Sequence, residues 1–128
     1  KKSGIKTLDD LKGQKVAAKA GTEGEEYAKT LAKDYGLEIV EFRDSPSMYQ
    51  DVVDGNTAAC FEDYPVMAFN IQQGTKLVIP DGMTADGNSY GFAVKKGENQ
   101  ELLKMFDQGL QNVKDSGLFD RIVKKYTR

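Results

Sequence analysis

The first part of the chain alternates between short apolar runs and longer segments in which apolar residues recur every three or four positions. Lys15–Ala18, Leu37–Phe42 and Ala58–Phe61 are runs of strand length, and the first shows little alternation. Continuous apolar runs are typical of strands that are buried on both faces of a sheet. Strands and helices that alternate with short connections predict an α/β fold with a parallel sheet and right-handed crossovers.

Three helices are predicted around these strands from the spacing of apolar residues. They begin after Gly21, at Ser45-Pro46 and at Pro65, and they end at Gly36, at Asp54-Gly55-Asn56 and at Gly74. A short capped helical turn, Thr7–Leu11, precedes the first strand. We expect these helical side chains to point inward: Tyr27, Ala28, Leu31, Ala32, Tyr35, Met48, Tyr49, Val52, Val53, Val66, Met67, Phe69 and Ile71.

The pattern changes at Pro80, where a polar, turn-rich segment of linker-like composition extends to Ser89. A strand is predicted over Tyr90–Lys95, followed by a long amphipathic helix and, beyond Gly117, a short last helix. The apolar positions of these two helices are Leu103, Phe106, Leu110, Val113, Phe119, Ile122, Val123 and Tyr126. The chain is therefore expected to comprise an α/β body, a connector and a helical tail whose apolar faces need a partner surface.

Composition restricts the chemistry of the chain. Its 128 residues include 18 Lys and Arg against 20 Asp and Glu, with no concentrated positive segment, so nucleic acid is not an expected partner. The absence of histidine excludes Ser-His and Cys-His catalysis and histidine metal sites, and no cofactor or metal is expected. Cys60 is the single cysteine, and its apolar surroundings in sequence predict an inert thiol of the core.

The end of the first strand carries one set of candidate binding residues, because ligands of open parallel sheets bind outside the carboxyl ends of the strands. After Lys19, a helix start offers backbone N–H groups and a positive dipole end to a carboxylate. Gly21 allows a close approach and Thr22 adds a hydroxyl. The local pattern taken alone favours a plain N-cap role for Thr22, with Glu25 as its capping-box partner.

The end of the third strand carries a second set, Glu62 and Asp63, two adjacent carboxylates that should point in different directions. A carboxylate that faces a cleft can hold an ammonium group through charge-assisted hydrogen bonds. The alternative is that Asp63 ends the strand and steadies the helix that begins at Pro65. A carboxylate-binding helix start and an ammonium-binding aspartate together predict a site for an α-amino acid.

Four segments, in order along the chain, carry a resemblance to a known family. They are IKTLDDLKGQKVAAKAGTEGEEYAK, FRDSPSMYQDVVDGNTAACFEDYPV, SYGFAVKKGENQELL and DSGLFDRIVKKY. The chain resembles the extracytoplasmic solute-binding proteins of amino-acid ABC importers, of the glutamine-binding kind (bacterial solute-binding protein family 3). The resemblance implies a periplasmic-binding-protein-like type II fold. Residues 1–86 would form the second, ligand-binding lobe, and residues 87–128 the return strand and the C-terminal helices that pack on the first lobe.

The resemblance also implies roles for the two candidate sets. Thr22, with the neighbouring backbone amides of Gly21 and Glu23, would bind the α-carboxylate of the ligand, and Asp63 would bind its α-ammonium group. No catalytic residue is implied. The binding roles together describe the capture of a free amino acid by lobe closure, with delivery to a membrane permease.

Lys19 and Glu62 would line the side-chain end of this pocket. Because their charges can offset each other, a polar L-amino acid is expected as the ligand, and glutamine is favoured. The chain departs from the family at Ala58, where an acidic residue is usual, and we expect this to remove a surface or turn contact without removing binding.

The family's first lobe has no counterpart in these residues, and neither has its arginine that pairs with the ligand carboxylate. We therefore expect a fragment of a longer receptor, whose start at Lys1-Lys2-Ser3-Gly4 looks like a cut. The expected partners are the amino acid, an ABC permease and the missing first lobe. As a fragment, the chain is expected to fold its tail back or to form a homo-oligomer or swapped dimer.

The expected location is extracytoplasmic, in the periplasm or at the cell surface through a lipid or a fused permease. Two alternatives remain open. The same fold can serve as an amino-acid sensor input domain, which differs only in what is attached to it. The same fold can also support a dehydratase-type activity, for which Glu62 is the one residue that we name as a candidate general acid or base.

Overall fold

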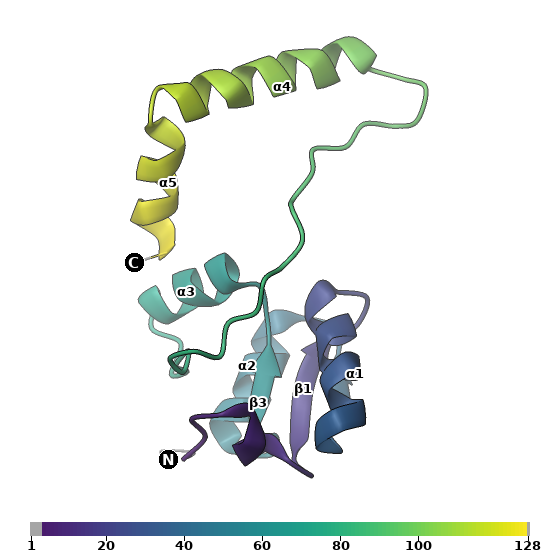
Figure 1. Cartoon of the computed structure of the whole chain (residues 1–128), viewed down its shortest axis with the longest axis vertical. Coiled ribbons are helices and arrows are strands. Elements are labelled where there is room, and N and C mark those ends of the chain that lie inside the picture. Colours follow the sequence, from purple (N-terminus) through teal and green to yellow (C-terminus); the bar gives the residue numbers. More distant parts are fainter. Residues whose placement is uncertain (1–3, 128) are drawn as a thin grey trace. The chain divides into compact units, whose positions relative to one another are not determined.

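The structure is a computed structural model, which describes residues 4–127. The predicted cut is at Lys1-Lys2-Ser3-Gly4, and the first three of these residues lie outside the described residues. Contacts within the chain divide it into two units, Lys1–Gly87 and Asn88–Arg128. Figure 1 shows the strands of the first unit and the two long helices of the second.

The first unit is built on a three-stranded parallel sheet, as the alternating pattern predicts. The order of the strands in the sheet is β2-β1-β3. The order of its elements along the chain is η1 (Leu8–Leu11), β1 (Lys15–Lys19), α1 (Glu23–Tyr35), β2 (Glu38–Phe42), α2 (Ser45–Asp54), β3 (Ala59–Phe61) and α3 (Tyr64–Gln72). β1 lies in the centre and pairs with both neighbours. The predicted α/β fold with a parallel sheet is therefore confirmed.

Side chains of β1 pack on both faces of the sheet. Val16 and Ala17 are fully buried, and so is Ala18. Ala17 packs in one core cluster with Met48 of α2, whereas Val16 packs in a second cluster that includes Leu31 of α1. Because successive strand residues point to opposite faces, α1 and α2 cover opposite faces of the sheet (Figure 1). This explains why the β1 sequence is apolar without alternation.

Local signals place the helix ends where the sequence predicts them. Thr7 is the N-cap of η1, a short 3₁₀ helix. Gly36 ends α1 and Gly55 ends α2, and both take the left-handed backbone conformation that glycine adopts without strain. The amide of Gly36 donates to the carbonyl of Ala32 and so closes the last turn of α1.

Three of the predicted inward side chains lie outside the core. Val53, Val66 and Phe69 are 37%, 40% and 38% exposed. Each helix offers only one stripe of its surface to the sheet. In α3 this stripe contains Met67 and Ile71, which are four positions apart and reach the same core cluster. The apolar run of α3 therefore overstated how much of that helix is buried.

Residues 76–80 follow α3 as an irregular segment without helix or strand. Leu77 and Ile79 nevertheless pack against the core cluster that contains Ala17, whereas Val78 is 81% exposed. The alternation of buried and exposed side chains persists here although no ladder of hydrogen bonds forms.

The second unit contains α4 (Gln100–Asp115) and α5 (Leu118–Thr127), which confirms the two predicted helices. Gly117 separates them with a φ of 70°. The predicted strand at Tyr90–Lys95 is wrong for this structure, because residues 88–95 form neither helix nor strand. A strand is stable only when a neighbouring strand completes its hydrogen bonds, and the strands of the described residues all pair with one another in the first unit.

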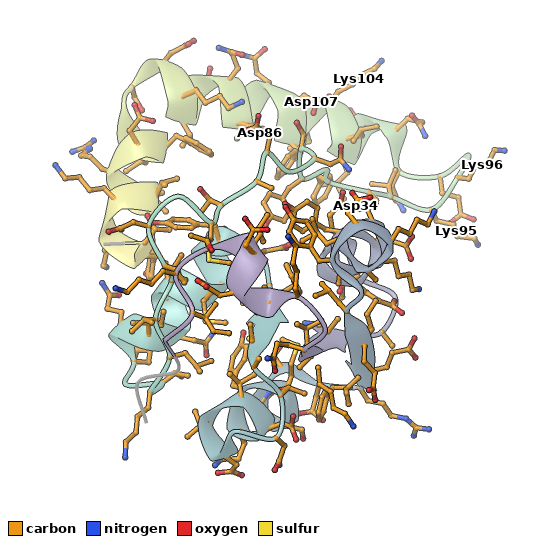
Figure 2. The ribbon with its side chains drawn as sticks, turned by 60° about the horizontal axis from the view of Figure 1, so that its bottom comes forward. Asp34, Asp86, Lys95, Lys96, Lys104 and Asp107 are labelled. Atoms are coloured by element: carbon orange, nitrogen blue, oxygen red, sulfur yellow. The ribbon has the colours of Figure 1, made fainter. Side chains whose placement is uncertain are left out.

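Both helices of the second unit are amphipathic, and neither contains a buried residue. Phe92 stacks on Phe106, with ring centroids 4.1 Å apart. Figure 2 labels Lys104 and Asp107 among the charged side chains of α4. The exposed apolar side chains, between 38% and 67% exposed, are Leu102, Met105, Phe106, Leu118, Phe119, Ile122, Val123 and Tyr126.

Candidate functional site

The carboxyl ends of the three strands meet at one edge of the sheet. Lys19 at the end of β1 is in register with Phe42 at the end of β2. Ala18 is in register with Phe61 at the end of β3, so Glu62 follows at the level of Lys19. The two sets of candidate residues, predicted separately from the sequence, therefore lie on neighbouring strand ends. This edge is where ligands of open parallel sheets bind.

The Glu62 carboxylate accepts three hydrogen bonds at this edge. Its Oε2 atom accepts hydrogen bonds from Ser45 Oγ at 2.8 Å and from the Tyr49 hydroxyl at 2.9 Å. Its Oε1 atom accepts from the backbone amide of Asp63 at 3.1 Å. The Glu62 side chain is only 7% exposed. The carboxylate is thus buried with its hydrogen bonds made, which offsets the cost of removing it from water.

Lys19 supplies the opposite charge. Its Nζ atom donates to Ser45 Oγ at 2.9 Å and lies 3.8 Å from Glu62 Oε2. The Lys19 side chain is 30% exposed, considerably more than that of its partner. The predicted offset of the two charges is present, and of the two side chains that of Lys19 is the more exposed.

Ser45 and Tyr49 join this cluster, although only structural roles were predicted for them from the sequence. They were expected to open α2 and to point inward, and both statements hold. Burial and the neighbouring Glu62 carboxylate raise the pKa of Tyr49, so its hydroxyl stays protonated and can donate. A signal existed in the sequence, because Asp44-Ser45-Pro46 repeats the Asp-x-Pro pattern of Asp63-Tyr64-Pro65 at a second strand end.

The Thr22 hydroxyl is engaged within the chain. Oγ1 donates to the carbonyl of Lys19 at 2.6 Å and accepts from the amide of Glu25 at 3.4 Å, so Thr22 is the N-cap of α1 as the local pattern favours. The expected capping box is not formed as predicted. The Glu25 carboxylate accepts from the amide of Gly21 at 2.7 Å, one residue before the N-cap.

Glu25 is therefore a buried anchor of this turn. The residue is 4% exposed and forms an ion pair with Lys29 at 2.8 Å. The Lys29 ammonium group, followed by the Gly21 amide, holds the pKa of the Glu25 carboxyl below its usual value. Gly21 itself has a φ of 73°, a conformation that glycine adopts without strain, and Glu23 is exposed in the first turn of α1.

Asp63 and Asp44 occupy equivalent positions in the two Asp-x-Pro turns but use their carboxylates differently. Asp44 accepts from the amide of Ser47 at 2.8 Å and so caps α2. This hydrogen bond and that of the Ser47 hydroxyl lower the pKa of Asp44. Asp63 stands at the N-cap of α3, with φ −59° and ψ 130°, and makes no side-chain cap hydrogen bond. The alternative in which the Asp63 carboxylate caps the helix is therefore not supported.

The Cys60 thiol lies in β3, close to this edge, but is not a reactive group. Burial, and then the charge of Glu62, raises the pKa of the Cys60 thiol to about 12. Cys60 packs against the core cluster of Ala17 and Met48, as expected for an inert thiol.

Residues 4–127 contain no group of three His, Cys, Asp or Glu side chains that could hold a metal ion. Within the same residues, no helix combines the length and apolar character needed to cross a bilayer.

Comparisons with known proteins reveal relatives that match almost the whole chain. The second substrate-binding domain of a putative amino-acid ABC transporter of Streptococcus pneumoniae is 39% identical, with a TM-score of 0.72, over 99% of this chain and 57% of that one. Substrate-binding domain 2 of GlnP from Lactococcus lactis, in its open conformation, is 41% identical, with a TM-score of 0.67, over 99% of this chain and 54% of that one. No protein-family model matches the chain.

A curated relative is the arginine-binding extracellular protein ArtP of Bacillus subtilis, 30% identical over 98% of this chain and 49% of that protein. The chain spans about half the length of the curated relatives it matches. The structural neighbours have the type II fold of periplasmic binding proteins, which confirms the fold expected from the sequence.

Proposed function

This chain is related, over nearly its whole length, to the solute-binding proteins of amino-acid ABC transporters, and we propose that it is the ligand-binding lobe of such a protein. In this proposal residues 1–86 form the second lobe, and residues 87–128 belong to the part that packs on the first lobe. The protein binds a free L-amino acid outside the cytoplasm and delivers it to a membrane permease. Catalysis is not part of this role.

The binding site is proposed at the carboxyl edge of the sheet. Asp63 binds the α-ammonium group of the ligand, whereas Thr22 and the amides of Gly21 and Glu23 bind its α-carboxylate. The observation that carries this assignment is the contrast between Asp44 and Asp63. Of the two Asp-x-Pro turns, only the one after β3 has an aspartate whose carboxylate does not cap its helix.

In the part of the site proposed to bind the ligand's α-carboxylate, two of the hydrogen-bond donors already have acceptors within this chain. The Gly21 amide donates to Glu25, and the Thr22 hydroxyl donates to the Lys19 carbonyl. An incoming carboxylate therefore either adds acceptors to these donors or replaces the internal ones. The internal Glu25 carboxylate demonstrates that this turn can satisfy a negative group by backbone hydrogen bonding.

Glutamine is the proposed ligand within the class of polar amino acids. The ion pair between Lys19 and Glu62 has no net charge, so a neutral amide fits beside it with less cost than a charged group. The oxygen of a terminal amide can also accept a hydrogen bond from the Lys19 ammonium group. Because ArtP is named for arginine, relatedness alone does not select glutamine.

Titration calorimetry of the longest form of the protein that contains this chain tests the proposal. The panel comprises the common L-amino acids, together with a prephenate-like acid whose products are followed separately. We expect saturable binding of polar amino acids, tightest for glutamine, without turnover. No binding of any amino acid would refute the proposal. Tightest binding of arginine or lysine would refute only the choice of glutamine.

Two alternative functions use the same fold. A dehydratase would need a free acid or base, but Glu62, the one candidate in the sequence, is already held by Ser45 and Tyr49. A sensor input domain would bind the same ligand, and a signalling segment instead of a permease in the same gene would identify it. Product formed from the prephenate-like acid would favour the enzyme.

The exposed faces of α4 and α5 are proposed to pack on the first lobe of the same receptor. In an isolated chain of residues 1–128 they pair instead with a second copy, through a homo-oligomer or a swapped dimer. The support is the set of large apolar side chains on helices that contain no buried residue. The receptor is proposed to be extracytoplasmic, in the periplasm or attached to the cell surface by a lipid or a fused permease.

A further inference from the structure

The two ions of the Lys19–Glu62 pair differ in how they are held. Two hydroxyl groups, Ser45 Oγ and the Tyr49 hydroxyl, donate to the same oxygen of Glu62. The Glu62 side chain is 7% exposed, whereas that of Lys19 is 30% exposed. A molecule that arrives at this edge therefore finds more of the Lys19 side chain accessible than of the Glu62 side chain.

Both hydroxyl groups come from a single turn of α2. Ser45 is the first residue of the helix, and Tyr49 lies four positions later on the same face. The Tyr49 residue is 6% exposed and packs in the core cluster with Ala17 and Met48. Packing thus fixes the position of its hydroxyl, and the high pKa of Tyr49 keeps this group a donor.

We propose that Ser45 and Tyr49 determine which class of amino acid the site accepts, because they hold Glu62 as the counter-charge of Lys19 and keep it from serving the ligand. This inference rests on the proposed function. The two residues are positioning residues, since they act through Glu62. The consequence is that Lys19 is the charged group that faces the end of the ligand's side chain.

The expected ligand class follows from the chemistry of the available group. An ammonium group donates hydrogen bonds and accepts none, so it suits a side chain that ends in a carbonyl or carboxylate oxygen. A guanidinium or ammonium side chain would be repelled by Lys19 and would find the Oε2 atom of Glu62 already engaged by two donors. If those donors are removed, Oε2 regains acceptor sites and Glu62 can pair with a cationic ligand.

The test measures the ratio of the dissociation constants for arginine and glutamine. It uses the longest form of the protein that contains this chain, with Ser45→Ala, Tyr49→Phe and the double variant. Tyr35→Phe is the matched control, because it removes a phenolic hydroxyl group at the far end of α1. We expect the double variant to shift the ratio toward arginine by about tenfold or more, the scale of a hydrogen bond to a charged group. The control should not shift it.

The outcomes separate the inference from the function on which it rests. If neither the parent protein nor any variant binds an amino acid, the proposed function fails and the inference fails with it. If the parent binds and the folded double variant keeps the same ratio, only the inference is overturned. Circular dichroism establishes that each variant is folded. Should the double variant be unfolded, Ser45→Ala alone decides, and an unchanged ratio in that variant overturns the inference.

Discussion

Gly24, in the first turn of α1, lies against the carbonyl group of Phe61 at the end of β3, so closely that a Cβ atom on Gly24 would stand 2.9 Å from the Phe61 oxygen. The contact is with backbone, which cannot move aside as a flexible side chain can. The start of α1 and the end of β3 are the two segments that carry the proposed binding groups. Their close approach keeps these groups on one edge of the sheet.

The first prediction follows from this contact. Gly24→Ala should lower the free energy of unfolding of the first unit by about 1–3 kcal/mol, because the added methyl group forces α1 away from β3. Denaturant unfolding measures the change. Gly109→Ala is the matched control, since Gly109 lies in α4 with nothing near its missing Cβ, and alanine there should favour the helix by about 0.5–1 kcal/mol. A destabilising effect of the same size in both variants would contradict the argument.

The second prediction concerns the two Asp-x-Pro turns. Asp63→Asn should weaken amino-acid binding by about 2–5 kcal/mol, because the ligand's ammonium group loses its counter-charge. Asp44→Ala should instead cost about 1 kcal/mol of stability through loss of the α2 cap, with affinity unchanged. Calorimetric titration and thermal unfolding of both variants measure the two effects. Normal binding by Asp63→Asn would show that the ammonium group binds elsewhere.

The third prediction is a pH dependence. The pKa of Glu25 is held below its ordinary value of 4.5 by Lys29 and the Gly21 amide. A lowered pKa in the folded state contributes stability above the unfolded value, and this contribution is lost as the pH falls through the folded pKa. The free energy of unfolding should therefore decline below about pH 5. Glu25→Gln should flatten that decline.

Urea unfolding at several pH values measures this dependence. Glu26→Gln is the matched control, because Glu26 contacts the same lysine, at 3.3 Å, but is exposed and contributes no hydrogen bond to Gly21. Both variants could retain the decline of the free energy of unfolding that the parent protein shows at acid pH. That result would contradict the role of Glu25 as an anchor of the turn.

The fourth prediction concerns the thiol of Cys60. Burial raises its pKa to about 12, so the thiolate is scarce at neutral pH, and the residue is partly buried against the core. In the folded protein at pH 8, labelling by a thiol reagent should be very slow, and it should become rapid in denaturant. Absorbance after addition of a disulfide reagent follows the reaction. Rapid labelling of the native protein would place Cys60 outside the core.

The fifth prediction is self-association of the isolated chain. Residues 1–128 should form an oligomer in solution, because Met105 and Ile122 are 67% and 45% exposed on the apolar faces of α4 and α5. Light scattering coupled to size exclusion measures the mass. Replacing both residues by lysine should shift the mass toward that of a monomer. A monodisperse monomer whose α4 amides are protected from hydrogen exchange would argue against association.

The relation between sequence and structure is clearest in β1 and its flanking turns. Val16, Ala17 and Ala18 predict a strand that is buried on both faces, and the structure confirms it. Gly36 and Gly55 predict helix ends, and both lie where expected. These features depend on the side chains and backbone preferences of a few neighbouring residues, which the sequence contains in full.

Predictions that needed a distant partner were less accurate. The strand expected at Tyr90–Lys95 is absent, because strand formation depends on a neighbour that an apolar pattern cannot supply. Val66 and Phe69 are exposed, since the burial of a helical side chain depends on what covers that side of the helix. Glu25 reaches Gly21 instead of Thr22, a difference of one residue that depends on the exact path of the turn.

The sequence by itself determined the parallel α/β body, the ends of its helices and the presence of candidate groups at Lys19, Thr22, Glu62 and Asp63. The tertiary structure decided how these groups are used. It brought Ser45 and Tyr49 to Glu62, paired Glu62 with Lys19 and left Asp63 out of the α3 cap. The reason is that strand order and register set distances between residues far apart in the chain, and local patterns carry no information about those distances.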